Sequence, residues 1–472
     1  MKKLELYPGQ KAVFERLKRF IEDPDQKVFI IKGYAGTGKT TMIIALIEML
    51  RAKLISFSLL ASTGRAAKVL SDITMVRAKT VHSEVYSFSG LNQNLDEQDH
   101  LTENNRVDET GQLLLVFEPN KVQRQNHIYV IDEASMVSDL EDKNNAQARF
   151  GSGRLLKDLL EFDPNGKFIF IGDSCQLPPI RQSISPALSV DYFKSVFNID
   201  AEEGELTEII RQKKGNGIVA SSKKIRELYS KPQPWTWAKY PFRGFDNIHL
   251  LPDQTSLLHD YIKDIKKNGL NGSTLICSTN KLCGMYANLI RPSLGIHTME
   301  LSVGDLLLVT QNNTQENLMN GDFVTVESLG SIKKQANLTF QLIEVKELWS
   351  NQVHSMLIIL DILYSDMTNL NQIQQKGLFI DFYNRMRKMG YKQNSGSFNS
   401  QMFADPYLNG LRAVYGYALT CHKAQGGEWD RIYLDIARHQ PAEKKPYVYQ
   451  WVYTAMTRAK KELYTVDDFW VI

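Results

Sequence analysis

The segment that most constrains the fold is the octapeptide GYAGTGKT at residues 33–40. An apolar run, Val28–Ile31, precedes it, and apolar residues at helical spacing, Thr40–Leu50, follow it. Such glycines let backbone N–H groups turn inward around phosphates, while the lysine bridges the β and γ phosphates and the threonine hydroxyl ligates Mg²⁺. The flanking strand and helix predict a phosphate-binding loop rather than a chance glycine-rich turn. The expected nucleotide contacts are Gly33, Ala35, Gly36, Thr37, Gly38, Lys39, Thr40 and Thr41, with Lys39 on the phosphates and Thr40 on the metal.

Short apolar runs recur along the chain, as expected for strands buried on both faces of a parallel sheet. Helical patterns lie between some of them, and a repeated strand–helix order predicts an α/β fold. A length of 472 residues suggests about three domains. The runs fall into two series, Ile55–Leu60, Ile128–Ile131 and Phe168–Ile171, then Ser273–Ser278, Ile432–Leu434 and Leu463–Val466.

Two stretches interrupt this rhythm and are interpreted as insertions. Residues 84–126 are polar apart from Leu113–Phe117, and residues 303–411 combine β-like runs with the turn signal Asn320-Gly321-Asp322. The sequence therefore predicts a first α/β domain (1–83 and 127–212), a small insertion (84–126), a second α/β domain (213–302 and 412–472) and a larger insertion (303–411).

Two polar segments follow predicted strands. Asp132 and Glu133 end the run Ile128–Ile131, so Asp132 is expected to hold Mg²⁺ through water and Glu133 to act as general base. Downstream of a phosphate loop, this pair indicates hydrolysis. Gln176, beyond the run Phe168–Ile171, could reach the γ-phosphate or the attacking water, or could simply belong to a proline-terminated loop.

Composition sets the broad class. The chain has 56 basic and 53 acidic residues, a net charge of +3, so any nucleic-acid-binding track must be local. Four cysteines form no C-x-x-C pair, which argues against a disulfide or zinc framework and favours a reducing compartment. No apolar run approaches the roughly 20 residues of a membrane span, and the N-terminal residues lack the apolar stretch of a signal peptide. We expect a soluble, cytoplasmic protein.

Further segments, in the same order, resemble the motifs of superfamily 1B DNA helicases, specifically the RecD-like and phage Dda-like group. About nine motifs occur between residues 6 and 461, although Ser62 stands where the family often has proline. Residues 84–126 and 330–411 match little. The resembling segments are Leu6–Gln10 (adenine recognition), Ala61–Lys68 (motif Ia), Lys79–His82 (the next DNA-contact motif), Leu206–Gln212 (motif IV), Tyr417–Trp429 (motif V) and Val452–Lys460 (motif VI).

The resemblance implies two RecA-like domains with ATP and Mg²⁺ between them and single-stranded DNA across their tops. It implies a β-hairpin insertion, or pin, in the first domain and a β-barrel-like insertion in the second. Arg211 and Arg458 would be arginine fingers on the γ-phosphate, Gln10 would contact adenine, and Gly426 and Glu428 would contact phosphate and ribose. The positions where the family grips DNA are Thr63, Thr80, His82, Asn280, His422 and Lys423.

The expected function is therefore that of an ATP-dependent DNA helicase moving 5′→3′, a monomeric motor acting on single strands and duplex forks with replication or repair partners. Two alternatives remain open: a translocase that displaces proteins with little unwinding, and an ATP-regulated nucleic-acid-binding module, against which Glu133, Gln176 and the two arginines argue. RNA also remains open, because strand contacts are mostly to phosphate. In the hairpin, Phe88 or Phe117 would stack on the last base at the fork or merely pack on the protein.

Overall fold

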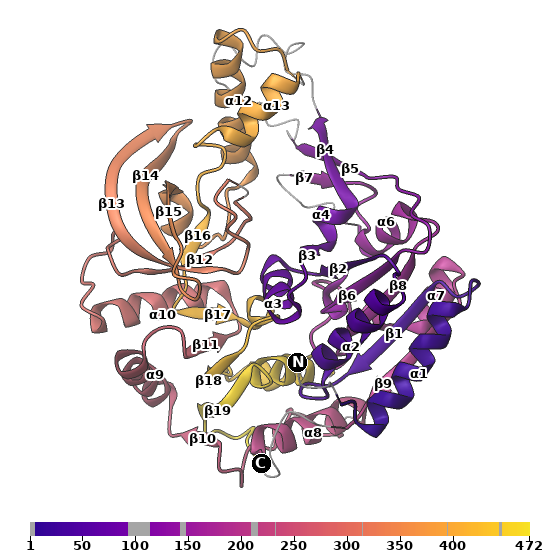
Figure 1. Cartoon of the computed structure of the whole chain (residues 1–472). Helices are drawn as coiled ribbons and strands as arrows, with labels where there is room; N and C mark the ends of the chain where they lie inside the picture. Colours follow the sequence, from indigo (N-terminus) through magenta and orange to yellow (C-terminus); the bar gives the residue numbers. More distant parts are fainter. Residues whose placement is uncertain are drawn as a thin grey trace.

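The computed structural model describes residues 5–92, 114–141, 148–208, 216–231, 233–313, 315–393, 395–442 and 446–472. Two α/β domains lie side by side, and the two insertions meet at one end of the molecule (Figure 1). None of the described helices is long and apolar enough to cross a membrane.

The first α/β domain is a six-stranded parallel sheet in the order β3-β2-β6-β8-β1-β9. Helices α1, α2 and α3 cover one face, and α6 and α7 cover the other. Because both faces are buried, the central strands are apolar throughout, as predicted. The strands are β1 (Val28–Gly33), β2 (Phe57–Ala61), β3 (Ala78–Thr80), β6 (Ile128–Asp132), β8 (Lys167–Gly172) and β9 (Ala201–Leu206), and the helices are α1 (Pro8–Glu22), α2 (Lys39–Ala52), α3 (Gly64–Thr74), α6 (Leu155–Phe162) and α7 (Val190–Phe197).

The second α/β domain is a five-stranded parallel sheet in the order β10-β19-β18-β11-β17. With it, the predicted α/β class built on two parallel sheets is confirmed. The strands are β10 (Ile248–Leu251), β11 (Ser273–Cys277), β17 (Ala418–Thr420), β18 (Trp429–Leu434) and β19 (Ala459–Val466), and the helices are α8 (Gly217–Ser230), α9 (Gln254–Asn268), α10 (Asn280–Ser293), α14 (Cys421–Ala424) and α15 (Tyr447–Met456).

The small insertion contains an antiparallel strand pair. Strands β4 (Tyr86–Leu91) and β5 (Leu115–Pro119) pair with one register shift between Phe88 and Gly90, and they are called the hairpin below. Residues 93–113, between the two strands, lie outside the described residues. A strand that the sequence did not predict, β7 (Ala148–Phe150), adds to β5 in parallel and makes the sheet three-stranded.

The larger insertion is a strongly curved antiparallel sheet in the order β15-β14-β13-β12-β16. Its edges approach each other, because the Leu411 N–H donates to Leu357 O at 2.6 Å and the Ile359 N–H donates to Leu411 O at 3.1 Å. This arrangement is barrel-like. The strands are β12 (Leu306–Val309), β13 (Phe323–Gln335), β14 (Leu338–Glu347), β15 (Val353–Ile359) and β16 (Ala413–Tyr415).

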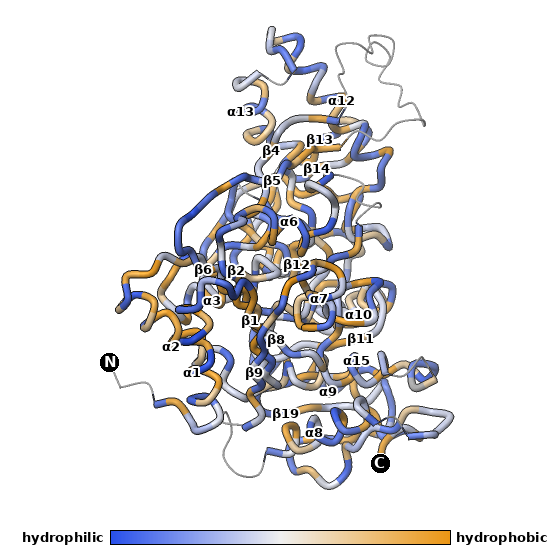
Figure 2. Tube along the Cα trace, turned by 90° about the vertical axis from the view of Figure 1, so that its right-hand side faces the viewer, coloured by the Kyte–Doolittle hydropathy of each residue, from blue (hydrophilic) through white to orange (hydrophobic). Residues whose placement is uncertain are grey.

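Three helices follow β15: α11 (Leu360–Leu363), α12 (Gln372–Lys388) and α13 (Gly396–Ala404). The buried aromatic side chains of α12 and α13 form an apolar cluster against Phe88 and Leu91 of the hairpin. Figures 1 and 2, at right angles, both place α12 and α13 beside β4. The two insertions therefore touch, and their meeting point is called the hairpin contact below.

Candidate nucleotide cleft and nucleic-acid groove

The phosphate-binding loop leaves the carboxyl end of β1 and enters α2. Gly36 and Gly38 have φ values of 81° and 83°, in the left-handed region that glycine adopts without strain. The Lys39 ammonium donates to Gly33 O at 2.8 Å and to Tyr34 O at 3.3 Å, and the Thr37 hydroxyl donates to Tyr34 O at 2.8 Å. The Lys39 ammonium is therefore held by backbone carbonyls of the loop itself, and phosphate oxygens could replace these carbonyls as hydrogen-bond acceptors.

Two carboxylates lie at the end of the neighbouring strand β6. Glu133 has a φ of 50°, a strained conformation for this residue type, and its Oε2 is buried without a hydrogen-bond partner among the described residues. Burial, together with the charge of Glu133, raises the pKa of Asp132 to about 7. A divalent cation would reverse that shift, so Thr40 and Asp132 fit the predicted Mg²⁺ site.

Gln176 follows β8 and is buried, with a side-chain oxygen that has no partner among the described groups. Its backbone is tied to the second α/β domain, because the Gln450 amide donates to Gln176 O at 3.2 Å. The next residue is also tied, since the Leu177 N–H donates to Thr454 Oγ1 at 2.8 Å. The loop after β8 therefore connects the nucleotide side of the first domain to α15.

These groups line one cavity of about 270 Å³ between the two domains, called the nucleotide cavity below. The first domain contributes the phosphate loop, both carboxylates and Gln176, while the second contributes Arg458 and Glu428. The lining residues are Tyr34, Ala35, Gly36, Gly38, Lys39, Thr40, Thr41, Asp132, Glu133, Gln176, Glu428, Thr457 and Arg458.

Arg458 is buried just beyond α15 and is held by its own domain. Its Nε donates to Thr454 O at 3.1 Å, and its Nη1 donates to Gly427 O at 3.5 Å. A guanidinium fixed in this way can stabilise charge on a phosphoryl group without reorganising. The second predicted finger, Arg211, lies outside the described residues.

The predicted base and ribose contacts lie around this cavity. Gln10 is buried, and its amide nitrogen donates to Thr37 O at 3.3 Å and Gly38 O at 3.4 Å, so it supports the phosphate loop directly. Its contact with adenine stays a prediction. Gly426, with a φ of 73°, lies in an adjoining cavity of about 480 Å³ that also contains Glu428 and Arg458.

One cross-domain contact was not expected from the sequence. The Tyr453 hydroxyl accepts from the Ala35 N–H at 3.2 Å and donates to Asp173 Oδ2 at 2.7 Å. Tyr453 therefore links α15 to the phosphate loop and to the loop after β8. Its position in motif VI is visible in the sequence, but a tyrosine carries no signal that distinguishes such a link from core packing.

A second, larger groove of about 660 Å³ runs between both α/β domains and the barrel-like insertion, and it is called the strand groove below. Five of the six predicted DNA contacts line it: Thr63, Thr80, His82, His422 and Lys423. Asn280 instead lines a small adjoining depression of about 60 Å³ that shares Lys423. The sequence missed the contributions of Asn312, Asn320 and Gly321 to this groove, since Asn320-Gly321-Asp322 was interpreted only as a turn of the barrel-like insertion.

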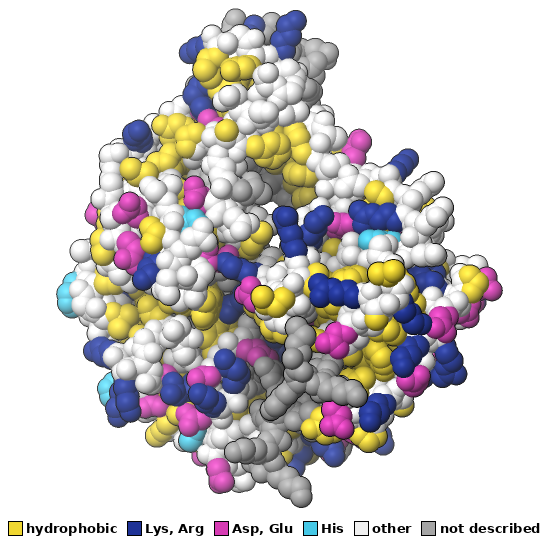
Figure 3. Space-filling model, in the orientation of Figure 1, with side chains coloured by type: hydrophobic (Ala, Val, Ile, Leu, Met, Phe, Trp, Pro, Cys, Tyr) yellow, Lys and Arg dark blue, Asp and Glu magenta, His cyan; other side chains and the backbone are white. Residues whose placement is uncertain are grey.

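The polar groups of the strand groove are rigidly held. Thr63 and Thr80 are helix N-caps: their hydroxyls accept from the Ala66 N–H at 3.2 Å and the Ser83 N–H at 3.1 Å. Burial lowers the pKa values of His422 and Lys423, which favours the neutral form of each side chain. On the face shown in Figure 3, several Lys and Arg side chains surround the hollowed centre, although the net charge is only +3.

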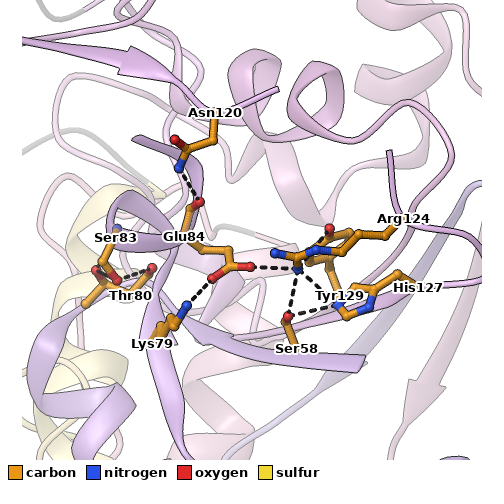
Figure 4. Close-up of polar contacts among 9 residues, drawn as sticks. All are labelled: Ser58, Lys79, Thr80, Ser83, Glu84, Asn120, Arg124, His127 and Tyr129. Atoms are coloured by element: carbon orange, nitrogen blue, oxygen red, sulfur yellow. Dashed lines mark hydrogen bonds and ion pairs between the residues drawn. The ribbon is translucent and has the colours of Figure 1, made fainter. Parts of the chain in front are cut away.

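An ion-pair network around the buried carboxylate of Glu84 supports the segment that carries Thr80 and His82 (Figure 4). The Glu84 carboxylate accepts from Lys79 Nζ at 2.7 Å and from Arg124 Nη1 at 2.8 Å. Burial alone would raise the pKa of Glu84, but these two hydrogen bonds lower it. Arg124 also reaches the Tyr129 hydroxyl at 3.3 Å, so the network connects the strand groove, the hairpin exit and β6.

The hairpin aromatics are engaged in packing. The Phe88 ring lies 5.3 Å from Phe403 of α13 and 5.6 Å from Phe117, and Phe117 stacks on Phe150 of β7 at 4.8 Å. The sequence left two roles open for these phenylalanines, stacking on a base at the fork and packing on the protein. The structure shows the packing contacts.

Two sequence families match parts of the chain. The AAA domain family matches residues 5–231, and the UvrD-like helicase C-terminal domain family matches residues 415–466. No curated protein sequence matches the chain.

Solved helicase structures resemble almost the whole chain. The crystal structure of the Pif1 helicase from Bacteroides in complex with ADP-AlF3 and ssDNA is 15% identical, with a TM-score of 0.50, covering 99% of this chain and 93% of that chain. A structure describing DNA unwinding at forked dsDNA by two coordinating Pif1 helicases is 16% identical, with a TM-score of 0.52. The match covers 99% of this chain and 94% of that chain. At these identities the likeness shows a shared fold.

Proposed function

We propose that the chain is a superfamily 1B helicase of the Pif1- and RecD-like group, an ATP-driven DNA helicase that moves 5′→3′ on single-stranded DNA and unwinds duplex. The two family matches and the likeness to Pif1 helicase structures support this proposal. One observation carries the proposal: groups from both α/β domains line the nucleotide cavity, and groups from the same two domains line the strand groove. A change in the distance between the domains would therefore alter both sites together. Of the structural neighbours, one Pif1 helicase is in complex with ssDNA, and another structure concerns DNA unwinding at forked dsDNA.

In the nucleotide cavity, Lys39 would bind the β and γ phosphates of ATP, and Thr40 and Asp132 would hold Mg²⁺, which neutralises phosphate charge when bound. Glu133 would accept the proton of the attacking water, for which its unpartnered Oε2 is suited. Arg458, with Arg211 from the other domain, would stabilise the charge on the transferring phosphoryl group.

Movement would follow from alternating grip. Closure on ATP would tighten the contacts that already join α15 to the first domain, at Tyr453 and at the loop of Gln176, and it would narrow the strand groove. Hydrolysis releases this closure, and the two sides of the groove, Thr63 and Thr80 on one and His422 and Lys423 on the other, take turns in holding the strand. We propose the predicted domain division and a monomeric motor with replication or repair partners as the setting for this cycle.

A second candidate, a translocase that strips proteins with little unwinding, is favoured by one observation. Phe88 and Phe117, which are both partly buried, pack on Phe403 and Phe150, so both rings are engaged in contacts within the protein. Strand separation would then depend on the outline of the hairpin rather than on base stacking.

The test is strand displacement on matched 5′-tailed and 3′-tailed DNA duplexes, with RNA-tailed controls and the Glu133→Gln variant as a blank. Displacement of the 5′-tailed DNA duplex alone supports the proposal. Displacement of the 3′-tailed duplex alone overturns the direction. Release of streptavidin from biotinylated single strands without duplex displacement would establish the second candidate.

A further inference from the structure

Arg65, in the first turn of α3, is buried among aromatic rings that come from other parts of the chain. Its guanidinium carbon lies 4.6 Å from the Trp349 ring centroid, 4.7 Å from Trp429 and 5.5 Å from Phe323. Trp429 begins β18 of the second α/β domain, while Phe323 and Trp349 belong to the barrel-like insertion. These four residues are called the Arg65 clasp, and they join three parts of the molecule at one point.

The chemistry of the clasp suits arginine in particular. A guanidinium is planar and weakly hydrated, so it can lie on aromatic faces where an ammonium would lose its water. Arg65 is only 9% exposed, and its Nη1 is buried without a hydrogen-bond partner among the described groups. The rings and the nearby carboxylate of Asp322 therefore compensate for burying this charge.

The clasp lies beside the nucleotide cavity. Arg65 lines the adjoining 480 Å³ cavity together with Glu133, Glu428 and Arg458. A Cβ added at Gly427 would lie 3.0 Å from the guanidinium carbon, so the Gly426–Glu428 loop packs directly on it. The same loop accepts the hydrogen bond from Arg458 through Gly427 O. Arg65 thus contacts the backbone that holds the predicted arginine finger.

A neighbouring ion pair strengthens the same junction. One turn along α3, Lys68 Nζ lies 2.5 Å from Glu347 Oε2 and 3.8 Å from Asp322 Oδ2, both in the insertion. Because α3 begins next to Thr63, which lines the strand groove, one short helix connects the groove, the insertion and the loop of the arginine finger.

We infer that Arg65 is a positioning residue for ATP hydrolysis: when the cleft is closed, the Arg65 clasp sets the Gly426–Glu428 loop, and with it Arg458, against the first domain and couples that state to the barrel-like insertion. The inference rests on the proposed ATP-driven function and adds to it a link between the nucleotide and the insertion. Trp349, which is 47% exposed in a loop, is the member of the clasp that reports closure.

The test compares Arg65→Ala, Arg65→Lys, Trp349→Ala, Trp349→Phe and the Arg65→Ala/Trp349→Ala double variant, with Arg77→Ala as the matched control, an exposed arginine just beyond α3. Each of the two alanine variants should lower the DNA-stimulated kcat about tenfold while the KM for ATP changes less than about twofold. The kcat of the double variant should fall no further than that of either single alanine variant, because Arg65→Ala and Trp349→Ala remove the same contact. Trp349→Phe should retain most of the activity, and Arg65→Lys only part of it.

A second readout does not depend on turnover. ADP with aluminium fluoride and Mg²⁺, added to the DNA-bound protein, should change the tryptophan fluorescence of the parent and of Arg77→Ala, but not that of Arg65→Ala. A parental kcat in both alanine variants would overturn the inferred role of the Arg65 clasp. Reductions in kcat that add in the double variant would overturn it as well. A parent protein that hydrolyses no ATP on DNA would instead overturn the proposed function.

Discussion

The nucleotide cavity and the hairpin contact both join distant parts of the chain, but with opposite chemistry. The cavity is lined by charged and polar groups, and Glu133 Oε2 and Gln176 Oε1 are buried there without partners among the described residues. The hairpin contact is apolar, with Phe88 and Leu91 set against the aromatic cluster of α12 and α13.

This difference indicates how each region responds to change. An unpartnered buried polar atom costs about 1–3 kcal/mol of stability, so its presence points to a ligand or a reacting group. Replacing it should alter rate far more than stability. An apolar contact tolerates graded changes in volume, and its loss should alter the coupling between insertions while the chemistry continues.

The largest effect is expected at Arg458. Arg458→Ala should reduce DNA-stimulated ATP turnover by about 10³–10⁵-fold, because the lost guanidinium acts on the transition state. Affinity for single-stranded DNA, measured by fluorescence anisotropy, should stay near the parental value. The opposite result, with weak DNA binding and surviving hydrolysis, would move Arg458 from the cavity to the strand groove.

Glu133→Gln should reduce turnover by about 10²–10⁴-fold, because only the proton acceptor is lost. Binding of a fluorescent ATP analogue should persist, whereas Lys39→Ala should lose binding as well as turnover. Parental turnover in Glu133→Gln would show that another group activates the water.

At the hairpin contact, Phe88→Ala should lower the unwinding rate about twofold to tenfold, the equivalent of an aromatic pair worth about 0.5–1.5 kcal/mol. DNA-stimulated ATPase activity should change little. Phe403→Ala should lower the unwinding rate to the same extent as Phe88→Ala. The control is Phe469→Ala, which removes a half-exposed ring of the second domain. An equal fall in ATPase activity would erase the proposed contrast between the two regions.

The network of Glu84 lies between the two regions and should show a stability effect. Arg124→Ala leaves the buried Glu84 carboxylate with Lys79 alone, so the free energy of unfolding should fall by about 1–2 kcal/mol, discounted because Arg124 is partly exposed. Arg438→Ala, which removes an exposed ion pair with Asp468, should cost less. Urea unfolding measures both, and equal losses would argue against a supporting role for Glu84.

The smallest effect concerns pH. Burial and the charge of Arg124 hold the pKa of His127 below its usual 6.5. The unfolded chain therefore binds more protons in this range, so the stabilisation is complete above about pH 6.5 and is lost as pH falls through the folded-state pKa. His127→Gln should flatten the dependence of unfolding free energy on pH in this window. An unchanged slope would assign the dependence to other groups, such as His422.

The sequence predicted most where backbone geometry dictates residue type. Lys39 and Glu133 occupy motifs at a helix start and a strand end, and Arg458 lies between the end of α15 and the start of β19. The structure places all three around one cavity. The predicted fold class is confirmed, and the two family matches agree with the predicted helicase family. The roles of the individual site residues stay predictions.

Other features could not be predicted because their function depends on a partner far along the chain. Tyr453 and Arg65 look like ordinary motif neighbours until α15 and the insertion are in place. The aromatic side chains of α12 are buried by contact with α13 and the hairpin, and the hairpin lies far away along the chain. Strand β7 has three residues, too few for a hydrophobic pattern.

The hairpin contact has a topological consequence. It closes the molecule on one side of the strand groove, where Phe150 and His82 lie, while α3 and the insertion close it on the other. A strand lying in the groove would be encircled, so a linear strand could thread in from its end but a covalent circle could not enter until Phe88 and Phe403 part. The rate of loading onto circular single strands would then report how often this gate opens, and the same closure would delay escape once the strand is inside.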